Sequence, residues 1–188
     1  MRCVLLAMLV TAHTGSRAHC ESPQSDREQL IGTWKVEVFE DDGRDRLSRL
    51  GAGPAKKKGQ KPRVAKLVFT KDECYLIRGD GRREMASGLT NAGFKSCKLE
   101  ESKTPKSIDL HGFAGKQNEK TKTYPGIYEI DGDKLRICYA ETSSTRPTKF
   151  ESDGHNNLFE CERISEKPLP PPEKKSENRT KKPAGDVK

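Results

Sequence analysis

Apolar residues are scarce in this chain of 188 residues, since hydrophobic types make up 31% of it and charged residues 34%. No apolar run reaches the roughly 20 residues that a membrane-spanning helix needs. The longest one, Cys3–Ala12, follows Arg2 and precedes the small-x-small pattern of Ser16–Ala18. This order is typical of a cleaved signal peptide. We therefore expect residues 1–18 to be a signal peptide, residues 19–29 to lead into the domain, and the mature chain to lack a transmembrane segment.

Cys20 lies two positions after this segment and would be the acylated residue of a lipoprotein. The positions before it carry Arg17 and His19, where a lipobox has apolar or small residues. We therefore expect a secreted or periplasmic protein, with lipidation at Cys20 as the less favoured alternative.

Groups of residues that carry chemistry are also missing. Neither His111 nor His155 stands in metal-ligand spacing with a second histidine, a cysteine or a carboxylate. No serine, cysteine or lysine has a recognisable activating neighbour, and most carboxylates of the expected strands alternate onto solvent-facing sides. We expect no enzyme: no catalytic residue, no metal site and no cofactor.

The net charge of +8 is confined to two segments. Residues 41–63 contain eight Lys and Arg against three Asp, and residues 165–188 contain seven against four acids. The first segment lacks an apolar period and exceeds the roughly 12 to 15 residues usual for a structureless connection. The second is rich in proline and almost free of apolar residues, so it cannot bury enough surface to offset chain entropy. We expect a disordered basic insertion and a disordered tail.

The segment Gly126–Ala140 fits a single β-hairpin register throughout. With Gly132 first in a two-residue type II′ turn, Ile130 lies opposite Leu135, Glu129 opposite Arg136 and Tyr128 opposite Ile137. One face then carries only apolar and aromatic side chains and the other carries charges, as in an antiparallel sheet with one side in water. The inward set is Tyr128, Ile130, Leu135, Ile137 and Tyr139, and the outward set is Glu129, Lys134 and Arg136.

Shorter patterns place the remaining elements. Ser25 and Glu28 form a capping box that predicts a short helix. Residues 33–40 alternate as a strand, with Trp34, Val36 and Val38 on one face. A second hairpin is expected from 64–70 and 74–78, and further strands from 82–88, 94–99, 107–110, 120–124 and 157–164.

Many short strands at hairpin spacing, with almost no helix, predict an all-β fold. We expect an antiparallel up-and-down barrel of eight or nine strands spanning residues 30–164, with the short helix at its N-terminal end. A β-sandwich is the alternative.

Four motifs carry a resemblance to a known family: Leu30–Val36, Thr104–Leu110, Gly126–Ala140 and Arg146–Ser152. Together they make the span from Leu30 to Ile164 similar to a lipocalin-like, calycin-type domain of planctomycete bacteria. The resemblance implies a barrel in which Trp34 plugs one end and Arg163 lies across its indole, a cation–π contact of roughly 0.5 to 2 kcal/mol. It also implies an internal pocket, without naming an occupant.

The aromatic residues Trp34, Tyr128, Tyr139 and Phe159 should converge inside this barrel. They either fill it or line a site for one small ligand. We expect a monomeric binding module for a small apolar or amphipathic molecule or for a macromolecular partner. The alternative is an inert barrel that the basic loop and tail attach to cell-envelope polyanions or to nucleic acid.

Signal-peptide cleavage would leave five cysteines, an odd number. Cys74 and Cys97 each alternate with apolar residues on strands expected to be adjacent, so a disulfide between them is possible and free thiols are the alternative. Cys138 shares the outward face of its strand, whereas Cys161 shares the inward face with Phe159. These last two cysteines are not expected to pair.

Overall fold

The computed structural model describes residues 24–55, 59–83, 93–114, 120–141 and 145–170. The predicted signal peptide, Cys20 and most of the predicted strand 82–88 lie outside these residues. Within the described ranges, no helix combines the length and the apolar character that a membrane crossing requires.

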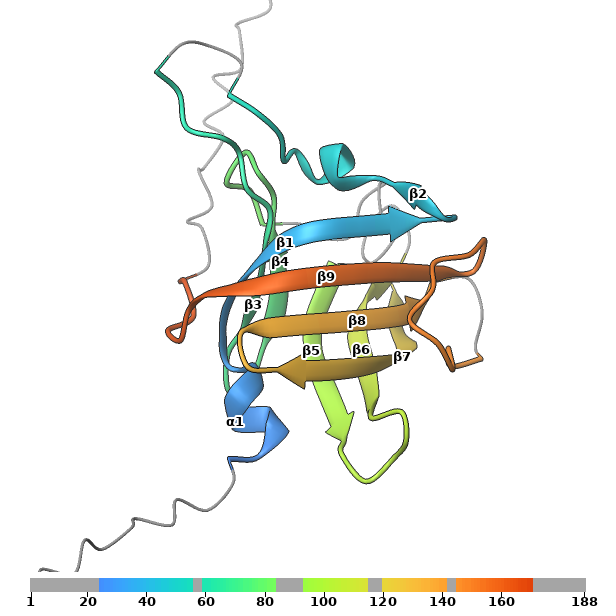
Figure 1. Ribbon diagram of the computed structural model, residues 1–188. Helices are drawn as coiled ribbons and strands as arrows, with labels where there is room; N and C mark the ends of the chain where they lie inside the picture. Colours follow the sequence, from blue (N-terminus) through green and yellow to red (C-terminus); the bar gives the residue numbers. More distant parts are fainter. Residues whose placement is uncertain (1–23, 56–58, 84–92, 115–119, 142–144, 171–188) are drawn as a thin grey trace, which may run out of the picture.

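The described chain is built almost entirely of strands (Figure 1). The elements in order are α1 (Asp26–Leu30), β1 (Gly32–Asp41), β2 (Arg44–Asp45), the 3-10 turn η1 (Leu47–Leu50), β3 (Lys66–Phe69), β4 (Cys74–Ile77), β5 (Gly93–Glu100), β6 (Ser107–Ala114), β7 (Lys120–Asp131), β8 (Lys134–Ala140) and β9 (Asn156–Ser165).

Eight of these strands form one antiparallel sheet that curls into a nearly closed barrel (Figure 1). The strand order is β4-β3-β1-β9-β8-β7-β6-β5, with the short β2 folded back onto β1. The two end strands, β4 and β5, lie in contact without forming a ladder. With β2 counted as part of the connection between β1 and β3, every ladder joins strands that follow each other in the chain, apart from the pairing of β9 with β1. This arrangement confirms the predicted all-β, up-and-down barrel over the alternative sandwich.

The hairpin of β7 and β8 has the predicted register. Tyr128 lies opposite Ile137 and Ile130 opposite Leu135. Gly132 occupies the first turn position with a φ of 55°, which a type II′ turn demands and which glycine adopts without steric cost. The capping box of Ser25 and Glu28 is also present, with both reciprocal hydrogen bonds.

The first strand differs from its predicted pattern because it contains a bulge. The pairing of β1 with β9 shifts register between Val36 and Val38. A bulge adds one residue and moves the following side chains to the opposite face. The prediction that Val38 faces inward is therefore wrong: Val38 is half-buried, and Phe39 enters the core with no exposed surface.

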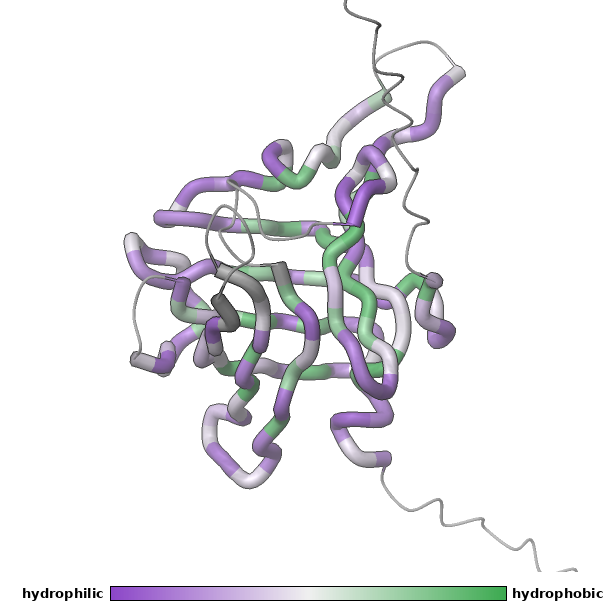
Figure 2. Tube along the Cα trace, turned by 180° about the vertical axis from the view of Figure 1, so that it is seen from behind, coloured by the Kyte–Doolittle hydropathy of each residue, from purple (hydrophilic) through white to green (hydrophobic). Residues whose placement is uncertain are grey.

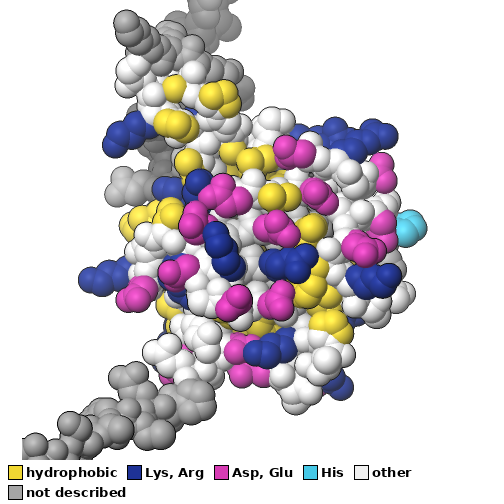
Figure 3. All heavy atoms as spheres, viewed as in Figure 1, with side chains coloured by type: hydrophobic (Ala, Val, Ile, Leu, Met, Phe, Trp, Pro, Cys, Tyr) yellow, Lys and Arg dark blue, Asp and Glu magenta, His cyan; other side chains and the backbone are white. Residues whose placement is uncertain are grey.

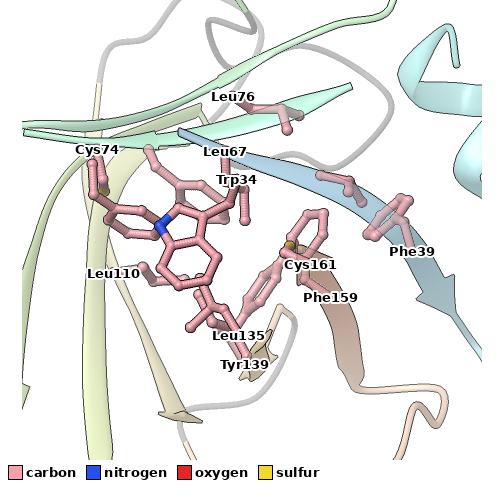
Figure 4. Close-up of a cluster of buried hydrophobic side chains, with 14 of the residues drawn as sticks. Trp34, Phe39, Leu67, Cys74, Leu76, Leu110, Leu135, Tyr139, Phe159 and Cys161 are labelled. Carbon is pink, nitrogen blue, oxygen red and sulfur yellow. The ribbon is translucent and has the colours of Figure 1, made fainter. Parts of the chain in front are cut away.

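Inward side chains from all eight barrel strands pack into one hydrophobic core (Figure 4). Alternation of apolar and polar residues along the strands is visible in Figure 2. The largest fully buried members are Trp34, Phe39, Tyr124, Tyr128, Tyr139 and Phe159.

Part of the outer barrel face is covered by the connection between β8 and β9. Phe150 of this connection packs on an outward-facing cluster of Ile127, Cys138 and Leu158. The predicted outward direction of Cys138 is confirmed, but the thiol is buried because this connection lies over it. The strand alternation predicts that these outward side chains face solvent, but under this connection they form a small separate hydrophobic cluster.

Arg146 holds this connection against the barrel. Its guanidinium donates to the carbonyl of Ile108 (2.9 Å), to the carbonyl of Gly126 and to the carboxylate of Asp109 (2.6 Å). Ile108 and Gly126 are paired across β6 and β7. One guanidinium therefore joins three segments that are distant in the sequence.

The basic insertion 41–63 is not disordered where the structure describes it, so that prediction is wrong for residues 41–55 and 59–63. It contains β2 and η1, and an isolated bridge joins Gly53 to Arg63. Leu50 has no exposed surface, and Ala52 belongs to the same core. The few apolar residues of the insertion are enough to anchor it because they reach an existing core instead of forming a new one.

The start of the predicted tail is also ordered. The hydroxyl of Thr33 donates to the carbonyl of Lys167 and accepts from the amide of Leu169, each at 3.1 Å. Leu169 packs on an outward cluster of Val68, Tyr75 and Ile77. The structure therefore corrects the predicted disorder for residues 165–170, while 171–188 lie outside the described residues.

One end of the barrel is closed by Trp34, Arg163 and the residues of α1. The Arg163 guanidinium lies 4.0 Å from the centroid of the indole. It also donates to the carbonyls of Gln29 (2.6 Å) and Ile31 (3.2 Å), and the indole Nε1 donates to the carbonyl of Leu30 (2.9 Å). The stacking of guanidinium on indole thus fixes the chain that leads from α1 into β1.

Truncating this pair should lower stability in a defined order. Trp34→Ala removes a fully buried aromatic side chain and should cost about 3 to 5 kcal/mol. Arg163→Ala should cost about 2 kcal/mol, because it removes the cation–π contact and two charged hydrogen bonds to carbonyls. Urea unfolding measures both. Arg163→Lys should not restore the loss, and Lys134→Ala on the exposed surface should change stability little; equal effects of Arg163→Ala and Lys134→Ala would contradict the structural role of Arg163.

The packing of Leu169 predicts a sharp boundary for truncation. A chain ending at Ser165 should lose roughly 1 to 3 kcal/mol, because the cluster under Leu169 becomes exposed. A chain ending at Pro170 keeps every described contact and should match the full chain in thermal and urea unfolding. If both truncations behave alike, the contact of Leu169 does not stabilise the barrel.

Candidate functional site

The four predicted ligand-lining residues, Trp34, Tyr128, Tyr139 and Phe159, all lie in the interior, each with at most 1% of its surface exposed. They contact one another and further core residues directly. Phe159 stacks between Phe39 at 4.8 Å and Tyr139 at 6.0 Å between ring centroids. The structure thus brings the predicted residues together, but as a packed aromatic core (Figure 4).

The polar group of Tyr128 already has a protein partner. Its hydroxyl donates to the carboxylate of Asp26 at 2.7 Å, and Lys106 binds the same oxygen at 2.6 Å. Asp26 is only 7% exposed, so these two partners compensate a buried charge. Burial and the bond to Asp26 raise the pKa of Tyr128. This hydroxyl ties α1 to β7 and is not available to orient a ligand.

Tyr139 is similarly engaged at the other end of the core. Its hydroxyl accepts from the side-chain amide of Asn157 at 3.0 Å, and the same amide donates to Glu141 at 2.6 Å. Asn157 is 2% exposed. Burial raises the pKa of Tyr139 well above its ordinary value, so the phenol stays protonated. The interior polar groups of the predicted site are therefore satisfied within the protein.

The outer face of β1, β8 and β9 carries charges of both signs, which alternate in Figure 3. Arg136 lies between Glu129 at 3.6 Å and Glu160 at 3.2 Å, and Lys134 pairs with Glu162 at 3.5 Å. These exposed cross-strand pairs contribute little stability each. They leave this face electrically balanced.

A groove beside this face is lined by basic side chains without acidic ones. It is an open depression of about 650 Å³ between β1, β3, the end of β4 and the last part of the insertion. We call it the cationic groove. Its lining contains five basic side chains and no carboxylate: Lys35, Lys61, Pro62, Arg63, Val64, Lys66, Ile77, Arg78, Gly79, Gly81 and Ile164.

Several cations of the groove lack compensation. Lys35 and Lys66 are directly opposite each other on β1 and β3, an arrangement that is unfavourable for like charges. Lys35 bonds Glu37 at 2.6 Å, which raises the lysine pKa. Lys61, Arg63 and Lys66 have no carboxylate partner among the described residues. The buried Arg63 Nε has no hydrogen-bond partner in the part of the chain that the structure describes. The groove therefore carries positive charge that the described residues compensate only in part.

The predicted disulfide between Cys74 and Cys97 is absent, because both are free thiols. The two cysteines nevertheless lie on the adjoining edge strands β4 and β5, where Cys97 packs against the core cluster that contains Cys74. Arg27 of α1 lies against this pair, with Nη1 at 3.1 Å from the Cys97 sulfur. Cys161 faces inward and Cys138 outward, as predicted, and these two also are free thiols.

Groups that could hold a metal ion are not found among the described residues. His111 contacts the hydroxyl of Thr123 at 3.0 Å, on exposed parts of β6 and β7.

Sequence reasoning missed the residues that define both surface features. The sequence patterns assign no role to Lys35, Lys66 or Arg27. The meeting of the two lysines with Arg63 depends on strand pairing between distant segments, for which no local signal exists.

Comparison with known proteins adds no relative to these observations: no family model, no curated protein and no solved structure matches the chain significantly. The lipocalin-like resemblance stays an expectation from sequence, and the function must be argued from the geometry of the site.

Proposed function

We propose that the protein is an exported, non-catalytic binding module that holds an anionic polysaccharide in the cationic groove. The observation that carries this proposal is the groove lining, which has five basic side chains and no acid. Positive charge concentrated in a concave surface attracts a polyanion and releases its counterions on binding. The filled interior supports the same conclusion, because it leaves the outer surface as the place for recognition.

The apolar part of the groove favours a polysaccharide over other polyanions. Ile164 is 47% exposed and is the large hydrophobic side chain that the described surface leaves exposed. Val64 and Ile77 also line the groove, so part of its lining is apolar. Anionic sugars offer charged groups at their rim and apolar ring faces. Single-stranded nucleic acid is bound mainly by stacking on aromatic side chains, and the groove lining has none.

Binding of heparin, used as a probe of this class, should depend on the groove. The Lys61→Glu and Lys66→Glu double variant should bind roughly tenfold or more weakly at low salt, because two attractive charges become repulsive. Binding of the unchanged protein should weaken steeply with salt, and the variant should show a shallower salt dependence. Titration calorimetry at several salt concentrations measures both.

The matched control is the Lys103→Glu and Lys134→Glu double variant, which makes the same change of net charge away from the groove. It should retain nearly full binding. A chain ending at Pro170 tests whether the basic tail contributes separately. Equal loss in both double variants would show that binding follows net charge alone, and stronger binding of single-stranded DNA than of heparin would contradict the choice of polymer. Deleting residues 41–63 is not a suitable test, because Leu50 and Ala52 belong to the core.

The second candidate is a small apolar or amphipathic ligand inside the barrel. It is favoured by the aromatic edge-to-face contacts of Phe94, Tyr124 and Tyr139, whose ring centroids lie 5.4 to 6.3 Å apart. Such rings line apolar binding sites as readily as they fill a core.

Native mass spectrometry separates the two candidates. If the interior binds a ligand, protein purified gently from its natural source should carry a discrete added mass that unfolding releases. The packed interior leads us to expect the bare mass of the processed chain. A retained small molecule that Tyr139→Ala abolishes would overturn this expectation.

A further inference from the structure

The barrel has one seam at which no backbone ladder joins the strands. Among the described residues, β4 is paired only with β3 and β5 only with β6, although β4 and β5 lie against each other. Side chains must therefore hold the seam. Among the side chains at the seam are Cys74 on β4, Cys97 on β5 and Arg27 of α1, which contacts Cys97.

Arg27 spans the seam through three contacts. Nη1 lies 3.1 Å from the Cys97 sulfur and 3.3 Å from the Cys97 carbonyl oxygen, and Nη2 donates to the carbonyl of Lys71 at 2.6 Å. Lys71 belongs to the turn between β3 and β4, so the guanidinium fastens that turn to β5. A guanidinium placed on a sulfur stabilises the thiolate form. Cys97 is also partly exposed, whereas Cys74 is buried.

The other described cysteines lack this environment. The hydrogen bond from Cys74 and the charge of Arg27 lower the pKa of Cys97 to about 7, in spite of its burial. The same hydrogen bond raises the pKa of Cys74. Burial raises the pKa of Cys138 to about 11 and also raises that of Cys161. The pKa of Cys97 is thus lowered and that of Cys74 raised, and the two cysteines lie on strands in contact with each other.

We propose that Cys97 and Cys74 form a redox-active dithiol site, in which a disulfide donor oxidises the pair to a covalent bond across the barrel seam. The Cys97 thiolate attacks one sulfur of the donor, and the other donor sulfur leaves as a thiolate. Cys74 then loses its proton and attacks the Cys97 sulfur of the mixed disulfide, releasing the second donor thiolate. The donor gains two electrons and two protons and becomes two thiols, while the protein loses two thiol hydrogens. The site is independent of the cationic groove.

Oxidised glutathione tests the proposal on the full mature chain carrying Cys20→Ser, so that only the four described cysteines remain. Peptide mapping without reduction should show the Cys74–Cys97 link as the main product at pH 7. Cys74→Ser should stop at a single glutathione on Cys97, and Cys97→Ser should take up almost none. Cys138→Ser is the matched control and should form the link like the parent protein.

The role of Arg27 is tested by measuring the rate of Cys97 alkylation as a function of pH, both in the parent protein and in the Cys74→Ser variant. In the parent protein the rate should reach half its maximum near pH 7 and rise no further above about pH 8. Arg27→Gln should move this midpoint upward and slow alkylation at pH 7 severalfold, and Arg27→Lys should move it less. Circular dichroism checks that each variant is folded, and the oxidised protein should melt at a higher temperature than the reduced one.

Three results would overturn the proposal. These are free thiols at Cys74 and Cys97 after oxidation, a dominant link to Cys138 or Cys161, or an alkylation midpoint of the parent protein at the ordinary cysteine value of about 8.5.

Discussion

The contact of the Arg163 guanidinium with Trp34 is the interaction on which the rest of the structure depends. The indole fills the end of the barrel, and the guanidinium above it holds the carbonyls of Gln29 and Ile31. The largely buried cation is compensated by the aromatic face, by the two carbonyls and by the carboxylate of Asp133 at 3.1 Å. The contact joins the last strand to the segment before the first strand, so it fixes the chain at the point where the first and last strands pair within the sheet.

The interior of the nearly closed barrel is occupied by packed side chains, so both proposed sites lie outside it, on the surface and at the seam. The inner hydroxyls of Tyr128 and Tyr139 are bonded within the protein. On the outside, the pairing of β1 with β3 sets Lys35 against Lys66 and concentrates positive charge in one groove. At the seam, the missing ladder leaves Cys97 at a strand edge. Surface recognition and thiol chemistry thus follow from how this sheet closes, and each can be changed without the other.

Local patterns in the sequence determined the elements and most of the register. The type II′ turn at Gly132 and the strict alternation around it specify the pairing of β7 with β8, because a slip by one residue would expose every apolar side chain. The capping box at Ser25 and the outward direction of Cys138 were predictable for the same reason: each depends on residues only a few positions apart. The all-β class followed from the number and spacing of such segments.

Only the tertiary structure decided which side chains of distant segments come into contact. The bulge in β1 that puts Phe39 in the core is set by pairing with β9, and no sequence pattern within β1 predicts it. Leu50 and Leu169 lie in segments too polar to fold alone, yet each is ordered because the barrel supplies the apolar partner. The cationic groove and the thiol pair likewise join side chains from separate strands. A sequence fixes the direction in which a side chain points when its neighbours set the period, whereas its partners are fixed by the free energy of the whole packed chain.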